Sequence, residues 1–434
     1  MMQFPPLPAR GSRAGAWLWL SLCLLLALTS MQATRAHAAT YYVAANGSDS
    51  NNGSAAYPFR QIRKALPLLK SGDTVLVGNG SYLGFTMYGI HGTATAPITI
   101  QATGANVNVT VTTDRPDNRD TILVSFCSYI VLNGLNAYYA NRAGVRIDQS
   151  PNITVCNAHY GHNYTWGIFT DFSDNLLIEN NTCFGSRTQH GIYVSNSCSN
   201  PVIEGNIVHD NHDCGIQLNG DKNMGGSGLI LGAWIGDNVI YNNGAGGGAA
   251  INMDGVQNST VCNNLLFNNY ASGIMNWRYD GAAGPSGMQI LNNTLDMPSG
   301  SRWALTFFSS AGPNYVRNNI LLNEGTYRGG LQFATATDVN DTNCDYNILS
   351  RVTVNSGNSV LTLAQWQATG HDLHSRSASL ASLFVHPSGG NYTLLSTAPA
   401  VNRGEILAAV PIDITGFSRP YGSSTDIGCY EWHP

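Results

Sequence analysis

The sequence predicts an all-β chain wound into a right-handed parallel β-helix, and three observations lead to this fold. Short apolar strands recur at intervals close to 23 residues, and an asparagine recurs at a fixed position after each strand in the sequence. Charged residues make up only 11% of the chain, against about 25% in typical domains. Glycine, in contrast, occurs 47 times. Such a composition suits turn-rich β structure and argues against a helical protein.

The strands that define the repeat are usually preceded by glycine and begin with an aliphatic residue. Most intervals are 23 to 26 residues, and two are longer, at 35 and 31 residues. A unit with strands of four or five residues cannot bury its own apolar face, so the units must stack in parallel. Leucine-rich repeats have a similar length, but their leucine pattern is missing here. The strands begin at Ile122, Val145, Ile168, Ile192, Ile216, Ile251, Ile274, Leu305 and Leu331.

A column of asparagines keeps the register of this repeat. An asparagine at a fixed turn can bond the backbone and adopt a left-handed φ, and neighbouring rungs lie about 4.8 Å apart. We therefore expect an internal ladder of asparagine side chains that holds the coil together. The column consists of Asn157, Asn181, Asn206, Asn238, Asn264, Asn293, Asn319 and Asn347.

The first 38 residues have the pattern of an export signal. Arginines at positions 10 and 13 precede an apolar run over residues 14–28, and residues 36–38 form a small-x-small cleavage site. We expect the mature chain to begin near Ala39 or Thr40 and to be secreted, outside the cell or in the periplasm. An uncleaved membrane anchor is disfavoured, because the run is shorter than the roughly 20 residues that span a bilayer.

The repeat predicts one domain with closed ends, because an open coil would expose sheet edges. Residues 59–69 carry apolar side chains on one helical face and predict an N-terminal capping helix; residues 72–77 predict the first strand. A short helix is expected over residues 361–369. The predicted organisation is a signal peptide (1–38), an N-terminal cap with the first strands (39–97), the coils (98–350) and a non-repetitive C-terminal cap (351–434).

Charge and cysteine content narrow the range of partners. The net charge of −5 and only three lysines leave no basic surface to bind nucleic acid. Of the nine cysteines, Cys23 lies in the predicted signal, and eight remain where disulfides can form. Cys156 and Cys262 precede an asparagine at equivalent repeat positions, which suits either a stacked core role or pairing. We expect a monomer with no membrane span after signal removal.

The predicted mature N-terminus carries a recognisable opening. Residues 41–43 read YYV and residues 46–53 read NGSDSNNG, followed by Pro58, Phe59, Ile62, Ala65 and Leu66. This opening resembles that of many secreted bacterial β-helix proteins, among them the pectate lyases of polysaccharide lyase family 9 and related uncharacterised parallel β-helix repeat proteins. The resemblance covers the N-terminal cap closely and the coil in general pattern. It implies a pectate lyase-like solenoid.

A second segment, residues 211–218 (NHDCGIQL), resembles the family 9 stretch in which an aspartate three residues before the strand helps to hold calcium. The matching residue is Asp213, which the resemblance implies as a calcium ligand. Family 9 also needs further aspartates one rung on, and a lysine base at the fourth strand position of a later rung. The fourth positions here are Asn219, Asp254 and Trp277. The lysine is missing, so the mechanism of that family does not carry over directly.

The outward residues of the predicted strands could bind a sugar chain. The first and third residues of each strand are expected to point inward, which turns the second and fourth outward. Aromatic faces cover sugar rings, while carboxylates and amides bind hydroxyl groups. The outward pairs are Arg146 with Asp148, Phe169 with Asp171, Tyr193 with Ser195, Gln217 with Asn219, Asn252 with Asp254, and Met275 with Trp277.

The two long intervals hold insertions, near residues 220–232 and 280–287, that leave from the outward ends of strands. Long loops on a rigid scaffold often carry function. We expect these two to wall one groove, over the rungs that start at positions 192, 216, 251 and 274. The cluster of Trp277, Arg278, Tyr279 and Asp280 lies at its edge.

Two chemistries fit such a groove, and the first is that of a lyase. A lyase must neutralise a uronate carboxylate and supply a base for the acidified proton. Asp213 with Asp254 or Asp171 could hold a calcium ion for the first purpose. The candidate catalytic residues are Arg278, Asp254, Lys222, Tyr279 and His190. The candidate substrate-binding residues are Tyr193, Gln217, Asn219, Asn252, Trp277, Asp280 and Asp171.

The second chemistry is that of a glycosidase, which needs two carboxylates about 5 Å apart for retention or about 6.5 to 9.5 Å apart for inversion. Asp148 and Asp171 are expected one rung apart, about 4.8 Å at the backbone. Each candidate also has a structural interpretation. In this interpretation, Asp148 and Asp171 cap turns at the ends of strands, His190 packs at a turn, and Lys222 is a solvated residue of a Gly-rich loop.

These features predict a carbohydrate-active enzyme that acts on an extracellular polysaccharide, with a lyase on uronate chains ahead of a glycoside hydrolase or an epimerase. The alternative is a non-catalytic surface protein that uses the coil as a sugar-binding or adhesive rod. The insertions and the outward polar groups favour the enzyme, whereas the missing lysine favours the binding protein.

Overall fold

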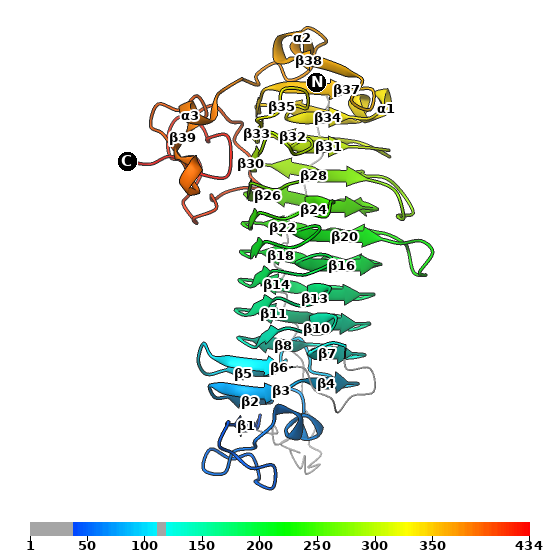
Figure 1. Ribbon diagram of the computed structural model, residues 1–434, viewed down its shortest axis with the longest axis vertical. Coiled ribbons are helices and arrows are strands. Elements are labelled where there is room, and N and C mark those ends of the chain that lie inside the picture. The colour runs from blue at the N-terminus through cyan, green and yellow to red at the C-terminus, as the bar shows by residue number, and fades with distance from the viewer. Residues whose placement is uncertain (1–37, 111–118) are drawn as a thin grey trace, which may run out of the picture. The chain divides into compact units, whose positions relative to one another are not determined.

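The computed structural model describes residues 38–110 and 119–434, which form a three-sided coil of parallel strands (Figure 1). The predicted export signal and its cleavage site lie almost entirely outside the described residues and stay a prediction. Each turn of the coil adds one strand to each of three sheets, named A, B and C here. Within the described ranges, sheets A and C each have 12 strands and sheet B has 11. No helix in these ranges is long and apolar enough to cross a membrane.

The strands follow one another in each sheet in chain order. Sheet A contains β1 (Thr40–Val43), β2 (Thr74–Val77), β5 (Ile98–Ala102), β8 (Ile130–Asn133), β11 (Ile153–Cys156), β14 (Leu177–Glu179), β18 (Val202–Glu204), β22 (Trp234–Gly236), β26 (Thr260–Cys262), β29 (Gln289–Leu291), β32 (Asn314–Arg317) and β35 (Thr342–Asp345). Sheet B contains β3 (Gly80–Leu83), β6 (Val107–Thr110), β9 (Asn136–Tyr138), β12 (His159–Gly161), β15 (Thr182–Phe184), β19 (Ile207–His209), β23 (Val239–Tyr241), β27 (Leu265–Phe267), β30 (Thr294–Met297), β33 (Ile320–Asn323) and β36 (Ile348–Leu349). Sheet C contains β4 (Phe85–Tyr88), β7 (Ile122–Ser125), β10 (Ala143–Asp148), β13 (Trp166–Asp171), β16 (Ile192–Asn196), β20 (Ile216–Gly220), β24 (Ala249–Asp254), β28 (Ser272–Trp277), β31 (Leu305–Phe307), β34 (Leu331–Phe333), β37 (Arg351–Val354) and β38 (Ser359–Thr362).

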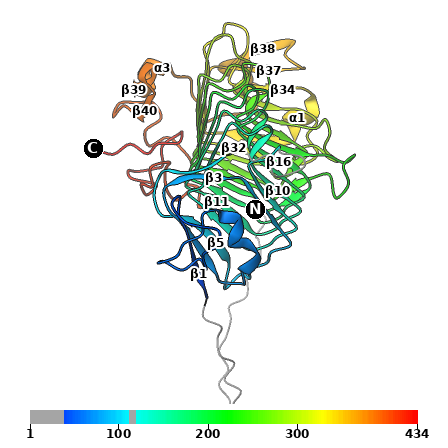
Figure 2. The same ribbon diagram turned by 60° about the horizontal axis from the view of Figure 1, so that its bottom comes forward.

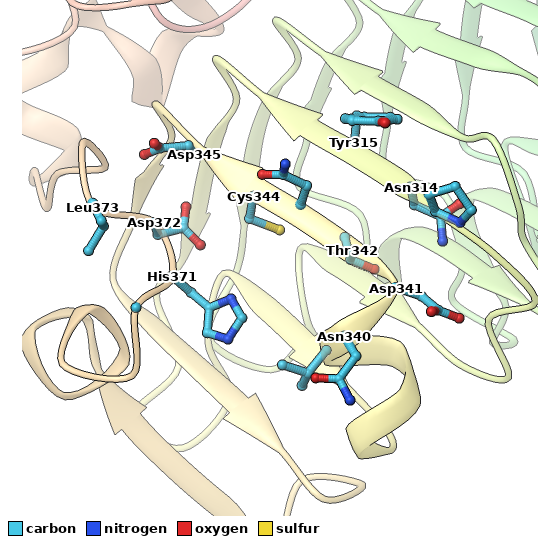
Figure 3. Close-up of a pocket in the computed structure, with 14 residues that line it drawn as sticks. Asn314, Tyr315, Asn340, Asp341, Thr342, Cys344, Asp345, His371, Asp372 and Leu373 are labelled. Carbon is cyan, nitrogen blue, oxygen red and sulfur yellow. The ribbon is translucent and has the colours of Figure 1, made fainter. Parts of the chain in front are cut away.

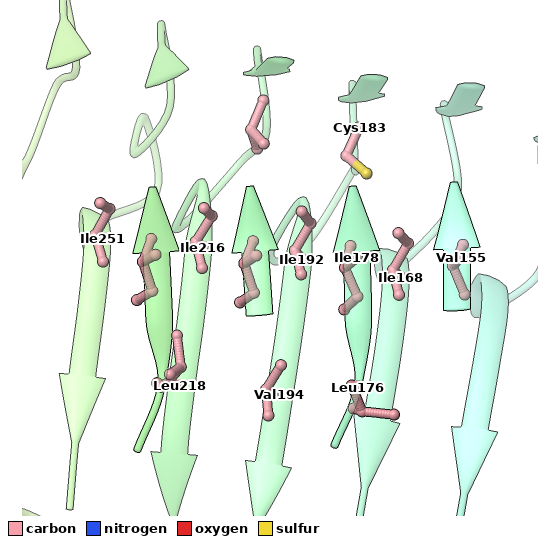
Figure 4. Packing of buried hydrophobic residues seen from close by; sticks show 14 of the residues in the cluster. Val155, Ile168, Leu176, Ile178, Cys183, Ile192, Val194, Ile216, Leu218 and Ile251 are labelled. Atoms are coloured by element: carbon pink, nitrogen blue, oxygen red, sulfur yellow. The ribbon is translucent and has the colours of Figure 1, made fainter. Parts of the chain in front are cut away.

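The predicted strand starts are confirmed, because all nine are successive register partners in sheet C, from Ile122 to Leu331. Their aliphatic side chains point into the coil and stack on one another, with the equivalent residues of the other sheets opposite (Figure 4). Ile168, Ile192, Ile216 and Ile251 are all fully buried. This continuous apolar column is what a single rung could not bury alone.

The asparagine ladder is present from Asn181 onward. The backbone N–H of Asn206 donates to Oδ1 of Asn238 (2.9 Å), and its Nδ2 donates to the same oxygen (3.0 Å) and to Ile178 O (2.9 Å). The same pattern recurs up to Asn319, and at Asn347 the next partners are the Ser375 hydroxyl and the Asp372 carboxylate. Every ladder amide thus satisfies backbone groups that would otherwise be buried without partners. The ladder residues are Asn181, Asn206, Asn238, Asn264, Asn293, Asn319 and Asn347.

Two details of the ladder differ from the prediction. Asn157 is not a member: it is exposed with a φ of 56°, and Ala158 occupies the ladder position of its rung, donating its N–H to Asn181. The left-handed φ therefore belongs to the residue before the ladder position, as at Asn180 and Asn263. A second ladder at the corner between sheets B and C was not predicted. It consists of Asn211, Asn243 and Asn269, with Ser186 before them.

The N-terminal end is closed as expected, but by two 3-10 turns, η1 (Ile62–Lys64) and η2 (Leu66–Leu68), in place of the predicted helix over residues 59–69 (Figure 2). Pro67 has no N–H to donate to Arg63, so a regular α-helix cannot pass this point. Ile62 and Ala65 are fully buried against the first rungs. The first strand is β1, and the segment predicted as first is β2.

The C-terminal segment is non-repetitive, as predicted, and has two parts. The end of the coil is covered by the antiparallel hairpin β37–β38 and by α2 (Leu363–Gln367), whose Trp366 joins the core, with α1 (Ala336–Asn340) beside them. The rest, including α3 (Leu380–Leu383), β39 (Phe384–His386), η3 (Pro387–Gly389) and β40 (Asn391–Leu394), lies along the side of the coil (Figure 1). It packs on the outer face of sheet B, where Ile320 and Tyr392 share a second apolar cluster.

The eight cysteines outside the predicted signal are all buried, and none is paired with another in the described residues. Cys156 and Cys262 occupy equivalent positions in sheet A, as the repeat predicted. Cys262 packs with Leu291 and with Val410 of the C-terminal segment. Both thiols are buried and unpaired, but neither belongs to the apolar core of the coil, to which the preceding residues Val155 and Val261 contribute.

Candidate functional site

The outward side chains of sheet C form two parallel columns, called the ribbon here. The first column contains Arg146, Phe169, Tyr193, Gln217, Asn252 and Met275, and the second contains Asp148, Asp171, Ser195, Asn219, Asp254 and Trp277. The predicted division between inward and outward positions is confirmed. Neighbouring rungs and loops cover much of the ribbon, so that several of its polar side chains are buried.

Two aspartates and an arginine meet at the strand ends of β10 and β13. Asp148 and Asp171 are register partners on these strands. Nη2 of Arg146 lies 2.8 Å from Oδ2 of Asp171 and 3.6 Å from Oδ1 of Asp148. Ser125, one rung earlier, donates to Oδ2 of Asp148 (2.8 Å). Two carboxyl groups one rung apart, here called the acidic pair, are thus held by one guanidinium group.

The Asp171 carboxyl is strongly perturbed. Burial raises its pKa to about 6, with a smaller contribution in the same direction from Asp148, while the Arg146 guanidinium opposes both. Oδ1 of Asp171 is buried and has no hydrogen-bond partner among the described residues. A carboxyl in this state can hold a proton in mildly acidic solution and release it to a reacting group, which is the requirement for a general acid.

Aromatic rings lie directly beside the acidic pair. The rings of Trp166 and Phe169 stack at 4.2 Å between centroids, and Phe169 stacks on Tyr193 at 5.4 Å. The Arg146 guanidinium lies 5.0 Å from the centre of the Phe169 ring. This aromatic platform suits a sugar ring. Trp166 was not among the predicted residues, because strict alternation along the strand would place it on the inward face with Ile168, whereas its ring stacks on that of outward Phe169.

Tyr193 and His190 were predicted as a substrate contact and a catalytic group. Burial raises the pKa of Tyr193 to about 12 and lowers that of His190 to about 3. The backbone N–H of Cys214 donates to Nδ1 of His190 (3.2 Å), so the proton of the neutral ring is on Nε2. At neutral pH both side chains are therefore hydrogen-bond donors, and neither is suited to act as a base.

The amide side chains of the ribbon contact one another. Nδ2 of Asn252 donates to Oε1 of Gln217 (2.7 Å), which also accepts from the Cys214 thiol (3.2 Å). Asn219 lies within hydrogen-bonding reach of Tyr193. These predicted substrate contacts form a strip of amides between the acidic pair and the loops, with Asn252 bonded to Gln217 and Asn219 bonded to Tyr193.

The two insertions lie against each other at the ends of β20 and β28, as predicted (Figure 1). The backbone N–H of Lys222 donates to Asp280 O (3.2 Å), and that of Ala282 donates to Gly228 O (3.0 Å). Ser197 also bonds the first loop, since it accepts from the N–H of Gly228 (3.0 Å). The loops therefore stand as one wall beside the strand ends.

Asp254 anchors the second loop and is almost fully buried, with 1% of its surface exposed. Oδ1 accepts from the N–H groups of Tyr279 (2.8 Å) and Gly281 (3.1 Å), and Oδ2 accepts from that of Asp280 (2.8 Å). Burial raises the pKa of Asp254, while these three donors lower it. With both oxygens engaged, we assign Asp254 the role of loop anchor in place of the expected catalytic role.

The remaining candidates lie on the rim of the loops. Lys222, Arg278 and Tyr279 are exposed, and the Tyr279 ring stacks on Trp277 at 5.7 Å. Trp277 is four rungs from Asp171 in the same column, or about 19 Å at the usual strand spacing. The predicted residues thus form two groups, one at the acidic pair and one at the loops, joined by the strip of amides.

The calcium ligand set implied by the family resemblance does not assemble. Oδ1 of Asp213 pairs with Nδ1 of His212 (2.9 Å), whereas Asp171 is held by Arg146 and Asp254 by the loop backbone. Residues 38–110 and 119–434 contain no group of three or more His, Cys, Asp or Glu side chains that could hold a metal ion. The residues around Asp213 therefore do not fit calcium.

Comparison with known proteins identifies the handedness of the coil. A family model described as a right handed beta helix region matches residues 96–230. The fold is a right-handed parallel β-helix. No curated protein matches the sequence.

Several solved structures share this β-helix. The pectate lyase Pel9A superposes with a TM-score of 0.62 at 16% identity, covering 91% of this chain and 96% of that one. A rhamnogalacturonan lyase gives a TM-score of 0.54 at 15% identity over 71% and 87% of the two chains. An alginate lyase from Paenibacillus sp. str. FPU-7 gives 0.51 at 16% identity over 68% and 97%. At these identities the likeness extends to the fold alone.

Proposed function

We propose that this protein is a carbohydrate-active enzyme that binds a polysaccharide along the ribbon and cleaves it at the acidic pair. The observation that carries the proposal is the state of Asp171, a buried carboxyl with a pKa of about 6 one rung from a second carboxyl group. Pairs of carboxyl groups with different environments are what glycosidic bond cleavage requires. The aromatic platform beside them supplies a surface for the sugar rings.

Hydrolysis is the reaction that this geometry supports best. Protonated Asp171 gives its proton to the glycosidic oxygen as the bond from that oxygen to the anomeric carbon breaks. The separation of one rung, about 4.8 Å at the backbone, is close to the roughly 5 Å of enzymes that retain the anomeric configuration. Asp148 then forms a glycosyl ester, and water, deprotonated by Asp171, releases the sugar. Arg146 positions both carboxyl groups.

β-Elimination on a uronate chain is the second candidate. It is favoured by the three similar structures, which are lyases of pectate, rhamnogalacturonan and alginate, and by exposed Lys222 and Arg278 on the loops. In that reaction Arg278 would neutralise the uronate carboxylate and Lys222 or Tyr279 would take the proton. The neutral His190 ring and the Tyr193 hydroxyl are hydrogen-bond donors at neutral pH and would only orient the substrate.

The test is a screen of the mature protein on polygalacturonate, alginate, rhamnogalacturonan, xylan and neutral glucans, with reducing ends and the ultraviolet absorbance of unsaturated products measured together. We expect new reducing ends without absorbance. Asp171→Asn and Asp148→Asn should lower turnover by at least about 10²-fold, whereas Asp210→Asn, at an exposed site on another face, should not.

The other outcomes identify the alternatives. Unsaturated products that Asp171→Asn leaves unchanged would mean a lyase centred on the loops. Retention on immobilised polysaccharide with no product from any substrate would mean a non-catalytic binding protein.

A further inference from the structure

The three sheets end differently at the C-terminal end of the coil. Sheet C ends in the antiparallel hairpin β37–β38, and the last strand of sheet B forms a bridge from Ile348 to Arg376. The last strand of sheet A, β35, has no further strand beside it among the described residues. A pocket of about 390 Å³ lies at this edge, between β32, β35 and the turn at residues 370–373 (Figure 3).

The pocket is lined by hydrogen-bonding groups without a cation from lysine or arginine. Asp341 and Asn343 both face it. Oδ1 and the backbone carbonyl of Asn343 accept from the Arg317 guanidinium group (2.7 and 2.6 Å), whereas the Asp341 carboxylate makes no hydrogen bond to another described residue. The ring of Tyr315, on the neighbouring strand, is 46% exposed. Asp345 and Asp372 also line the pocket but are engaged, Asp345 with His374 (2.7 Å) and Asp372 with the Trp366 indole (2.8 Å).

Two further groups are positioned but lack partners. The Thr342 side chain lines the pocket although only 3% of the residue is exposed, and its hydroxyl has no hydrogen-bond partner in the described residues. Buried hydroxyls normally have one. His371 stacks on Trp366 at 4.4 Å with 13° between the rings, which fixes its orientation at the pocket. A ligand that donates or accepts hydrogen bonds would bond the His371 ring, whereas the Thr342 hydroxyl is closed to solvent.

We propose that this pocket is a second carbohydrate-binding site, separate from the ribbon, which takes one or two neutral sugar units. Sugar hydroxyl groups both donate and accept, so they can bond the Asp341 carboxylate and the open edge of β35 together. The exposed Tyr315 ring can cover a sugar face. The pocket is lined by the carboxyl groups of Asp341, Asp345 and Asp372, against one nearby guanidinium group, that of Arg317, which is bonded to Asn343. This excess of negative charge disfavours uronates and other anions and selects for neutral sugars. The volume is in the usual range for small-ligand pockets.

The experiment measures binding by calorimetry in full mature protein that carries Asp171→Asn, so that bound sugar is not cleaved. The probes are xylotriose, cellotriose and mannotriose, with trigalacturonate as the anionic comparison. At least one neutral trisaccharide should bind, and Tyr315→Ala and Asp341→Asn should each weaken it by about tenfold or more, equivalent to about 1.4 kcal/mol. The matched control is Tyr139→Ala, an exposed tyrosine directly after β9, which should leave binding unchanged.

Four results would overturn the proposal: binding that both pocket variants leave intact, equal affinity for trigalacturonate, no binding of any neutral trisaccharide, or a dimer that Tyr315→Ala dissociates. The last would mean that the edge of β35 pairs with a second copy. Because binding is measured without turnover, failure of the ribbon as an active site would not affect this result.

Discussion

Asp171 and Asp254 occupy the same position of the repeat, three rungs apart, and have opposite environments. Both stand fourth in a strand of sheet C and point outward. Asp254 accepts three backbone N–H groups from the second loop. Asp171 has one strong partner, Arg146, and a buried oxygen with none. A loop that folds back over a strand end supplies backbone donors to the carboxylate of Asp254, and the rung of Asp171, which lacks such a loop, supplies none to its side chain.

The same conservative substitution should therefore have opposite effects at the two sites. Asp171→Asn should lower kcat by at least about 10²-fold while the melting temperature stays the same or rises, because a buried carboxyl with an unsatisfied oxygen becomes a neutral amide. Activity and thermal unfolding of the purified variant measure the two effects. A large loss of stability with no loss of turnover would make Asp171 a structural residue like Asp254.

Asp254→Asn should mainly destabilise the protein, because its NH₂ group would face backbone N–H donors that now have a carboxylate. Leaving buried donors unpaired costs about 1–3 kcal/mol each, so we expect a loss of at least about 2 kcal/mol and easier proteolytic cleavage within residues 278–288. Asp280→Asn is the matched control in the same loop. If the loop stays protease-resistant, the anchoring role is refuted.

The effect of pH on stability and turnover tests the role of Asp171 separately. The folded-state pKa of Asp171 is raised from 3.8 to about 6, so the folded protein binds this proton more tightly than the unfolded chain does. Its contribution to stability is present below pH 4 and is lost as the pH rises toward 6, by up to about 3 kcal/mol. Wild type should lose more stability than Asp171→Asn over this interval in denaturant titrations, and turnover should fall as the pH rises through about 6. Equal slopes would contradict the shifted pKa.

The smallest expected effects compare a ladder position with the position before it. Asn264→Ala removes the Nδ2 bonds to Ile235 O (2.9 Å) and Cys262 O (3.0 Å) and should cost about 1–3 kcal/mol. Asn157→Gly, at a left-handed and exposed position, should change the unfolding free energy by less than about 0.5 kcal/mol. Similar losses at both positions would mean that the ladder does not hold the coil.

The coil could be predicted from the sequence because its cause is local and repeated. Ile168, Ile192 and Ile216 are each buried against the equivalent residue of the next rung, so the same aliphatic pattern recurs at each strand start. The ladder was misplaced at one rung only, where Ala158 stands at the ladder position and Asn157 beside it. The prediction of an α-helix over residues 59–69 was wrong, because a single residue, Pro67, interrupts an otherwise helical pattern.

The candidate site could be predicted only in part. The ribbon follows from the alternation of strand residues, so the acidic pair could be placed one rung apart. The roles of Asp171 and Asp254 could not be distinguished, because the difference comes from the backbone of a loop whose path no periodicity describes. The pocket beside β35 escaped prediction for a similar reason: it depends on where sheet A ends in relation to a non-repetitive turn.

The C-terminal segment along the side of the coil affects how the protein unfolds. Solenoids have stabilities set by nearest neighbours, so their rungs can open one after another from an end. Here three successive rungs bond one C-terminal segment, residues 405–426, which we call the strap. Asn263 donates to Ile412 O, Asn292 to Asp426 O and Asn318 to Glu405 O. Those rungs should exchange their amide hydrogens as a single cooperative unit. No segment among residues 38–110 and 119–434 bonds the rungs of β2 and β5 in this way, so these rungs should exchange independently.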